Sequence, residues 1–212
     1  MKNNETNITI NKLATNEFTD ENSQIINCSE TLYDFSIASV NSLDSVVPLG
    51  NGFKICVMPL NETQGSLPWC AAYASARIFS YVTGKTIYAR DIMKYMYPTE
   101  TSSQLESRGI YNSEIITYGF LAHGLQLSYK NRTLSNSEVT AQLDRNSPIH
   151  IGMVRSSGEG HAMALYGYSP DIYSVWNPWY EYGESISNST LKYYTTSGTV
   201  YTWKDSIINY RN

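Results

Sequence analysis

Apolar residues recur at three- and four-residue steps through the middle of the chain. The longest such stripe follows Pro68-Trp69-Cys70 and stops at Gly84, a natural C-terminal end for a helix. Its apolar members are Ala71, Ala72, Ala74, Ile78, Phe79 and Val82. Shorter stretches with the same period predict three more helices, at 91–97, 112–124 and 137–143.

Residues from Leu125 onward follow a different period, in which apolar and polar side chains alternate. Such alternation predicts strands. The strand segments are 125–129, 148–154, 162–168 and 172–176, followed by a hairpin of 193–194 with 199–201. Helices therefore come first and mostly antiparallel strands follow. This order predicts an α+β fold with a helical lobe and a sheet lobe.

Composition and charge narrow the class of protein. The 212 residues suit one domain, or two small lobes around one cleft. Hydrophobic residues make up 42% and charged residues 16%, which argues against global disorder. The eighteen tyrosines are typical of strands and of binding surfaces that are partly exposed to solvent. A net charge of −4 argues against the basic surface that binds nucleic acid. No apolar run is long enough to cross a membrane.

The charge is concentrated near the start of the sequence. Residues 1–69 carry eight acids and three bases, a net −5, whereas residues 70–212 carry eleven acids and twelve bases, a net +1. The first part is also rich in Asn, Ser and Thr, and it lacks the basic-then-apolar layout of a signal peptide. We interpret 1–48 as an N-terminal extension that is a pro-segment remnant, a partner-binding tail or an ordered extra element.

Cys70 is the first candidate for a catalytic residue. It sits where the chain enters the longest predicted helix, and a helix N-terminus favours thiolate over thiol. Gln64 lies six residues earlier, and Gly65 lets the intervening loop fold back. The Cys70 backbone N–H and the Gln64 amide could then both serve as donors to a developing oxyanion. A buried structural cysteine is the default alternative for a lone residue.

His161 is the best candidate base. It starts a predicted strand among small residues, and Asn177 follows in Trp176-Asn177-Pro178-Trp179. Asn177 could accept from one ring N–H of His161 and fix its tautomer, with Trp179 covering that bond. Asn-Pro is also a common turn pair, and both interpretations can hold together.

The other two histidines fit a catalytic role less well. His150 lies within a predicted strand, which suggests a half-exposed face, and His123 lies at a helix end, where a charged histidine complements the helix dipole. No metal-binding spacing and no Gly-rich phosphate loop occurs, so we expect no metal and no cofactor.

The order Gln64, Cys70, His161, Asn177 resembles that of the papain-like cysteine peptidases, and the closest likeness is to the staphopains. The likeness runs from about Phe53 to Tyr210. It is carried by the segments Phe53-Lys54-Ile55, Glu62-Thr63-Gln64-Gly65, Trp69-Cys70-Ala71, Asp91-Ile92-Met93 with Tyr97-Pro98, His161-Ala162-Met163-Ala164 and Trp176-Asn177-Pro178-Trp179.

This resemblance implies a papain-like two-lobe fold over 49–212. The helical left lobe would span about 49–124, and an antiparallel sheet or half-barrel right lobe about 125–212. The implied roles are Cys70 as nucleophile, His161 as base and acid, Asn177 as orienting residue and Gln64 as oxyanion donor. The implied function is a secreted bacterial-type cysteine endopeptidase that works through a thioester acyl-enzyme. It would be an extracellular monomer whose partners are a protein or peptide substrate and a proteinaceous inhibitor.

The sequence departs from the family pattern in two places. Ala72 stands where staphopains tend to have glycine, and its methyl group could narrow the cleft. Cys28 and Cys56 have no obvious family counterpart. Whether they pair as a disulfide in an exported protein is an open question.

Two other functions compete with the peptidase. A Cys-His-Asn site also serves amidases, deamidases and transglutaminase-like enzymes, some of them toxins. The abundant tyrosine suggests a non-catalytic binding module, which would leave the ordered quartet as a coincidence.

Overall fold

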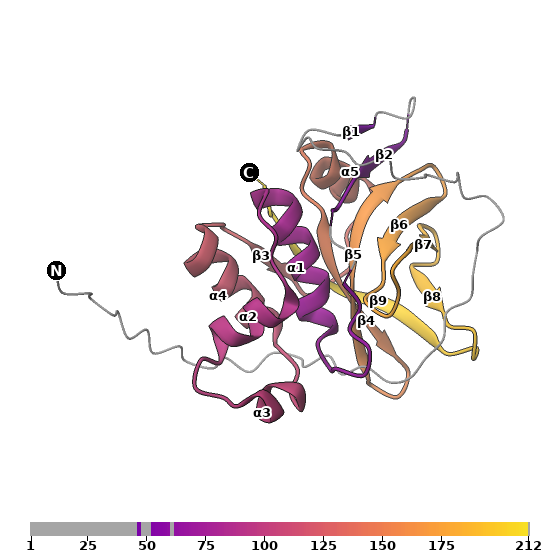
Figure 1. The fold of residues 1–212 in the computed structure, drawn as a ribbon. Coiled ribbons are helices and arrows are strands. Elements are labelled where there is room, and N and C mark those ends of the chain that lie inside the picture. The colour runs from indigo at the N-terminus through magenta and orange to yellow at the C-terminus, as the bar shows by residue number, and fades with distance from the viewer. Residues whose placement is uncertain (1–45, 48–51, 60–61, 212) are drawn as a thin grey trace.

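The computed structural model describes residues 46–47, 52–59 and 62–211. Five helices occur in these residues, and most of them lie on one side of the molecule (Figure 1). They are α1 (Cys70–Thr83), α2 (Ala89–Met96), α3 (Ser102–Glu106), α4 (Asn112–His123) and α5 (Asn136–Asp144). The expected extension 1–48 lies outside the described residues except for 46–47.

The strands of the described residues form one antiparallel sheet on the other side of the molecule. Its main order is β1-β2-β5-β4-β9-β3. In addition, β6 pairs with β5, β7 pairs with β6, and β8 pairs with β9. The strands are β1 (Val46–Val47), β2 (Lys54–Cys56), β3 (Ser128–Lys130), β4 (Ile149–Arg155), β5 (Gly160–Tyr168), β6 (Ile172–Trp176), β7 (Gly183–Ser187), β8 (Lys192–Tyr194) and β9 (Val200–Ile208).

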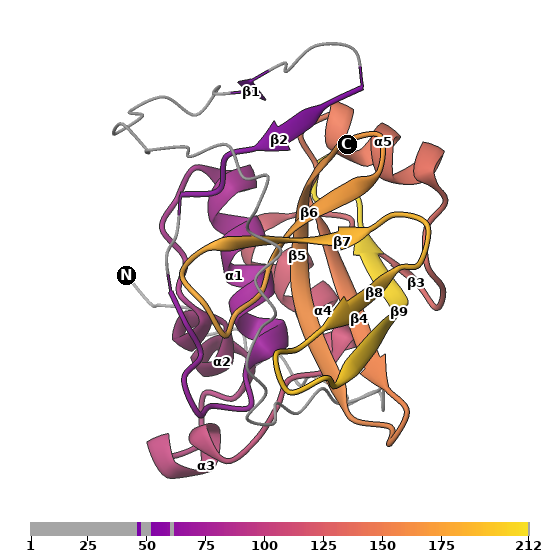
Figure 2. The same cartoon turned by 90° about the vertical axis from the view of Figure 1, so that its right-hand side faces the viewer.

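The sheet curls instead of lying flat. The pairing register shifts between Gly152 and Met153 in β4, and between Leu165 and Gly167 in β5, and such bulges bend a strand. As a result β7 and β8 contact each other although they attach to different strands of the sheet (Figure 2). The predicted α+β fold, with a helical lobe and an antiparallel sheet lobe, is confirmed.

Helix α1 is the centre of the molecule, because it packs against α2 and α4 on one side and against β4 and β5 on the other. Its residues from Cys70 to Tyr81 are all buried, as expected for a helix that is mostly apolar or small, and they include Arg77. Ala71, Ala72 and Ala74 give α1 a narrow profile. Gly84 ends the helix with a left-handed φ of 69°.

The predicted elements differ from the observed ones mainly at short polar segments. The four predicted helices are present with shifted ends, whereas α3, β2 and β7 were not predicted from periodicity. The strand predicted at 125–129 is limited to Ser128–Lys130. In addition, β2 precedes the helices in the chain but pairs with β5. The sheet lobe therefore includes residues from before the helical lobe. None of the described helices is long and apolar enough to span a membrane.

Close packing at Gly167 generates a prediction about stability. A Cβ atom at this position would lie 2.8 Å from the Lys54 carbonyl oxygen of β2, so Gly167→Ala must push β2 away from β5. We expect a loss of about 1–3 kcal/mol in the free energy of unfolding, measured by urea denaturation, as for other overpacked sites. Gly198→Ala is the control, because its Cβ would meet nothing within 4 Å and only its φ of +82° is strained. An unfolding midpoint of Gly167→Ala equal to that of the unmodified protein would contradict this packing.

Candidate active site

His161 and Asn177 are joined directly. The imidazole Nε2 of His161 lies 2.8 Å from Asn177 Oδ1, and both side chains are buried. His161 is the second residue of β5, and Asn177 follows the last residue of β6, which pairs with β5. The antiparallel pairing of two neighbouring strands therefore places these two side chains together, as the sequence predicted.

The tautomer of His161 follows from a second hydrogen bond. The backbone N–H of Trp179 donates to Asn177 Oδ1 at 3.1 Å, so the atom that faces His161 is an acceptor oxygen and not the amide NH₂. Nε2 must then carry the hydrogen that Asn177 accepts. The other ring nitrogen, Nδ1, keeps its lone pair, and it is buried without a hydrogen-bond partner among the described residues. A neutral imidazole in this state can accept a proton at Nδ1.

Trp179 covers the pair, as predicted from the sequence. Its ring stacks on the His161 imidazole with centroids 3.8 Å apart and planes 16° from parallel. Tyr201 approaches His161 edge-on at 6.0 Å. This enclosure lowers the pKa of His161 to about 3 because burial disfavours the charged ring, although the hydrogen bond that His161 donates to Asn177 acts in the opposite direction. The ring is neutral at pH 7 until a negative partner forms beside it.

Cys70 is the first residue of α1 and is fully buried. The preceding Trp69 is fixed by a hydrogen bond from its indole N–H to the Leu105 carbonyl at 2.9 Å. Because the first N–H groups of a helix have no intrahelical acceptor, they point positive charge at this thiol. Helix α1 packs along β5, the strand that carries His161.

Gln64 belongs to a loop that reaches the Asn177 turn. Its backbone N–H donates to the Pro178 carbonyl at 2.9 Å, and its side-chain Nε2 donates to the Leu67 carbonyl at 2.7 Å. Gly65 adopts a left-handed φ of +56°, which glycine tolerates well and which suits the expected folding back of this loop. The described contacts thus bring Gln64, His161, Asn177 and Trp179 together, with Cys70 at the end of the same loop as Gln64.

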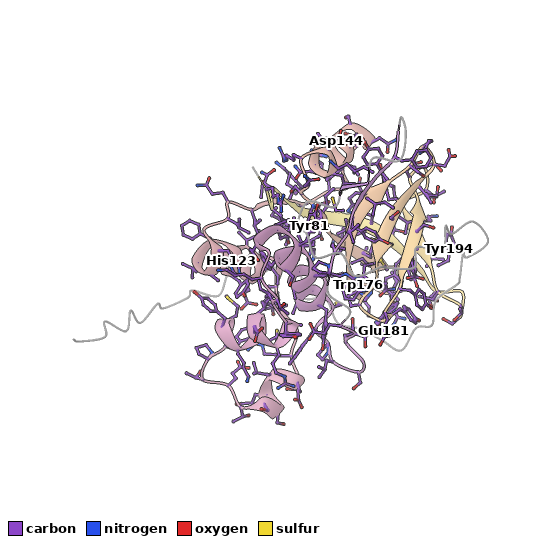
Figure 3. The ribbon with its side chains drawn as sticks, turned by 45° about the horizontal axis from the view of Figure 1, so that its top comes forward. Tyr81, His123, Asp144, Trp176, Glu181 and Tyr194 are labelled. Atoms are coloured by element: carbon purple, nitrogen blue, oxygen red, sulfur yellow. The ribbon has the colours of Figure 1, made fainter. Side chains whose placement is uncertain are left out.

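A second contact joins the two lobes next to the site. The guanidinium of Arg77 in α1 lies 4.5 Å from the ring centroid of Trp176, the residue before Asn177. Figure 3 shows Trp176 at the seam between α1 and the sheet, and Figure 2 shows the β6–β7 loop over the face of α1. This contact fixes the end of β6 against the helix that begins with Cys70.

Comparison with known proteins decides the family. The family model described as Staphopain peptidase C47 matches residues 50–210, which is most of the chain. The chain belongs to the staphopain peptidase family. Its class is accordingly that of a cysteine peptidase, a hydrolase, as the resemblance implied.

Relatives of this staphopain-family chain include two staphylococcal proteins. An extracellular cysteine protease of Staphylococcus epidermidis is 28% identical over 163 residues, which cover 71% of this chain and 92% of that protein. Staphopain A of Staphylococcus aureus strain MRSA252 is 28% identical over 193 residues, which cover 84% of this chain and 45% of that protein. The chain thus spans less than half the length of that staphopain A. A solved structure described as a C39-like peptidase from Bacillus anthracis aligns with 68% of this chain and 94% of its own, at 13% identity and a TM-score of 0.46.

The other histidines of this staphopain-family chain correct the sequence analysis. His150 was expected on a half-exposed face, but it is fully buried, with Nδ1 2.9 Å from Ser75 Oγ. The expectation was wrong because β4 is an inner strand, flanked by β5 and β9, with α1 packed against it. His123 does end α4, but burial and then Lys85 lower its pKa, so the predicted charged form is disfavoured.

The two remaining cysteines are Cys56 and Cys28. Cys56 in β2 is buried, forms no disulfide with a described residue, and has a pKa raised chiefly by burial. Cys28 lies outside the described residues, so the question of a disulfide with Cys56 stays open as in the sequence analysis. No group of three or more His, Cys, Asp or Glu side chains in the described part of the chain could hold a metal ion.

Burial of His150 generates a prediction about acid sensitivity. Burial and then the neighbouring His161 lower its pKa from 6.5 to about 3. Between these values the unfolded chain binds a proton that the folded chain does not. The free energy of unfolding therefore falls as the pH falls through this window, by up to about 1.4 kcal/mol per pH unit for one such group.

His150→Asn removes this titration and keeps a polar partner for Ser75. We expect a shallower dependence of the urea-unfolding free energy on pH between pH 6 and pH 4 in the variant. Comparison of the two slopes isolates His150, because the other buried groups contribute to both proteins. Equal slopes would show that His150 takes up its proton in the folded state.

Proposed function

We propose that this chain is a secreted cysteine endopeptidase in which Cys70, His161, Asn177 and Gln64 perform peptide-bond hydrolysis. The single observation that carries the proposal is the buried His161–Asn177 hydrogen bond, which leaves Nδ1 as the basic nitrogen. Family membership and the extracellular cysteine protease among its relatives support the choice of peptides as substrates and of secretion.

In the first half of the proposed reaction, the Cys70 thiol gives its proton to His161 Nδ1. The thiolate then attacks the scissile carbonyl carbon, and the carbonyl π electrons move to the oxygen. The Cys70 backbone N–H and the Gln64 side-chain amide donate hydrogen bonds to this oxyanion. As the C–N bond breaks, His161 Nδ1–H protonates the leaving amine and a thioester to Cys70 remains.

In the second half, water replaces the released amine. His161 Nδ1 removes a proton from the water, whose oxygen attacks the thioester carbonyl. The C–S bond then breaks, the carboxylic acid product leaves, and the proton returns to the Cys70 sulfur. Throughout both halves, Asn177 Oδ1 accepts the hydrogen bond from His161 Nε2–H. This bond keeps Nδ1 facing the reacting atoms. Burial makes a charged imidazole costly on its own, so imidazolium is stabilised only while the thiolate or oxyanion lies beside it.

Labelling of the thiol tests the nucleophile and the substrate class together. We expect a peptide epoxide to modify Cys70 alone, detected by peptide mass spectrometry, and Cys70→Ala to lose both the label and peptide hydrolysis. His161→Ala should lose nearly all of the labelling rate, because no base remains to generate the thiolate.

Cys56→Ala is the matched control for this labelling. Its thiol is buried and its pKa is raised, so its removal should leave labelling unchanged. Efficient labelling of Cys56 in Cys70→Ala, or retained hydrolysis of a denatured protein by Cys70→Ala, would contradict the assignment. Labelling by a small acyl donor without peptide cleavage would indicate an amidase or acyltransferase instead.

Gln64→Ala tests the oxyanion donor. We expect kcat for a short peptide substrate to fall by about 10²–10³-fold with little change in KM, as for the loss of one oxyanion donor in other acyl-transfer enzymes. The rate of Cys70 alkylation by iodoacetamide should stay unchanged, because alkylation develops no oxyanion. A parallel loss of both rates would show that Gln64 shapes the thiol site instead.

A further inference from the structure

Three polar side chains from three separate segments meet at the amide of Asn177. We call Asn177, Glu184 and Tyr193 the amide cluster. Glu184 lies in β7, directly across from Val175 of the β6 strand that leads into Asn177. Tyr193 lies in β8, which contacts β7, and its ring is 6.4 Å from that of Trp179. The curl of the sheet therefore brings β7 and β8 to the side of Asn177.

The polar atoms of the amide cluster complement one another. Asn177 Nδ2, Glu184 Oε2 and Tyr193 Oη are all buried, and none has a hydrogen-bond partner of ordinary geometry among the described residues. One is an amide donor, one a carboxyl acceptor, and one a hydroxyl that can donate or accept. Leaving all three unsatisfied in the interior would be costly, so small side-chain rotations that join them are favoured.

The pKa shifts of Glu184 and Tyr193 agree with the closeness of the three side chains of the amide cluster. Burial raises the pKa of Glu184 to about 8, and the nearby side chains of Asn177 and then Tyr193 oppose this rise. The pKa of Tyr193 is raised first by burial and then by the negative charge of Glu184. The hydrogen-bond contribution of Asn177 requires that its side chain lie near the Glu184 carboxyl, in agreement with the register of β7 against β6.

We propose that Glu184 is a positioning residue, whose carboxyl accepts the Asn177 Nδ2–H bond and so holds the amide with Oδ1 toward His161. The inference rests on the proposed function, because it extends the set His161–Asn177 by one member. In this arrangement Glu184 holds Nδ2, while the Trp179 backbone N–H and His161 Nε2–H hold Oδ1. Both polar atoms of the Asn177 amide, Nδ2 and Oδ1, then have defined hydrogen-bond partners.

The orientation of this amide determines whether His161 can act as a base. A flipped amide would turn its NH₂ group toward His161, and Nε2 would have to accept. The ring hydrogen would then sit on Nδ1, which could no longer take a proton from Cys70. Loss of the acceptor at Glu184 should therefore impair proton transfer rather than substrate binding.

Kinetics of matched variants provide the first test. Glu184→Met keeps the length of the side chain and removes the carboxyl. We expect kcat to fall about tenfold, the equivalent of one net hydrogen bond, with KM changed less than about twofold. Glu184→Gln retains an acceptor oxygen and should keep kcat within about threefold of the unmodified protein. Glu181→Gln, an exposed carboxyl three residues away, should leave both constants unchanged.

Nitrogen NMR of His161 provides the second test, and it does not depend on activity. In a Cys70→Ala background at pH 7 the ring is neutral, since burial lowers its pKa to about 3. With Glu184 present we expect a pyrrole-type ¹⁵N resonance at Nε2 and a pyridine-type resonance at Nδ1. With Glu184→Met the two resonances should move toward each other as the tautomers mix, and with Glu184→Gln they should stay apart.

The two tests separate failure of this inference from failure of the proposed function. Unchanged His161 resonances in folded Glu184→Met protein, or an unchanged kcat, would overturn the positioning role. Glu184→Leu replaces Glu184→Met should the latter not fold. Absence of peptide hydrolysis by the unmodified protein would overturn the proposed function, yet the NMR comparison would still decide whether Glu184 sets the tautomer.

Discussion

The hydrogen bond between His161 Nε2 and Asn177 Oδ1 is the interaction on which the candidate site depends. It assigns the ring hydrogen to one nitrogen and leaves the other as a base, and the Trp179 N–H bond to the same oxygen favours the orientation of the amide in which Oδ1 faces His161. The stacked indole keeps water from this bond. Without this bond, the ring hydrogen of the buried His161 would not be fixed on either nitrogen.

The fold supplies this interaction through two constraints. Antiparallel pairing of β5 with β6 brings His161 and Asn177 together, and α1 lies against β5 with Cys70 at its first turn. Small residues in α1 and the contact of Arg77 with Trp176 hold the helical lobe against the sheet lobe. The site therefore forms at the seam of the two lobes, where neither lobe alone carries the full set of residues.

Much of this arrangement could be predicted from the sequence, because the long helix and the paired strands lie in periodic segments. The catalytic-type residues lie at the ends of these segments or in the loops beside them. Short polar elements could not: β7 reads Gly-Glu-Ser-Ile-Ser and carries no clear alternation of apolar residues, so Glu184 escaped notice. His150 was misjudged because alternation along one strand says nothing of what covers both of its faces. Pairing of β2 with β5 is a contact between distant segments that no local pattern encodes.

The central claim is that the acyl group of the substrate passes through the sulfur of Cys70, with His161 as the base. The most direct measurement is acid quenching within the first turnover of a peptide ester, followed by mass mapping of the trapped acyl group. The account predicts the acyl group as a thioester on Cys70, and its absence in His161→Ala at the same reaction time. An acyl group on another residue, or product formation by Cys70→Ala at the unmodified rate, would contradict it.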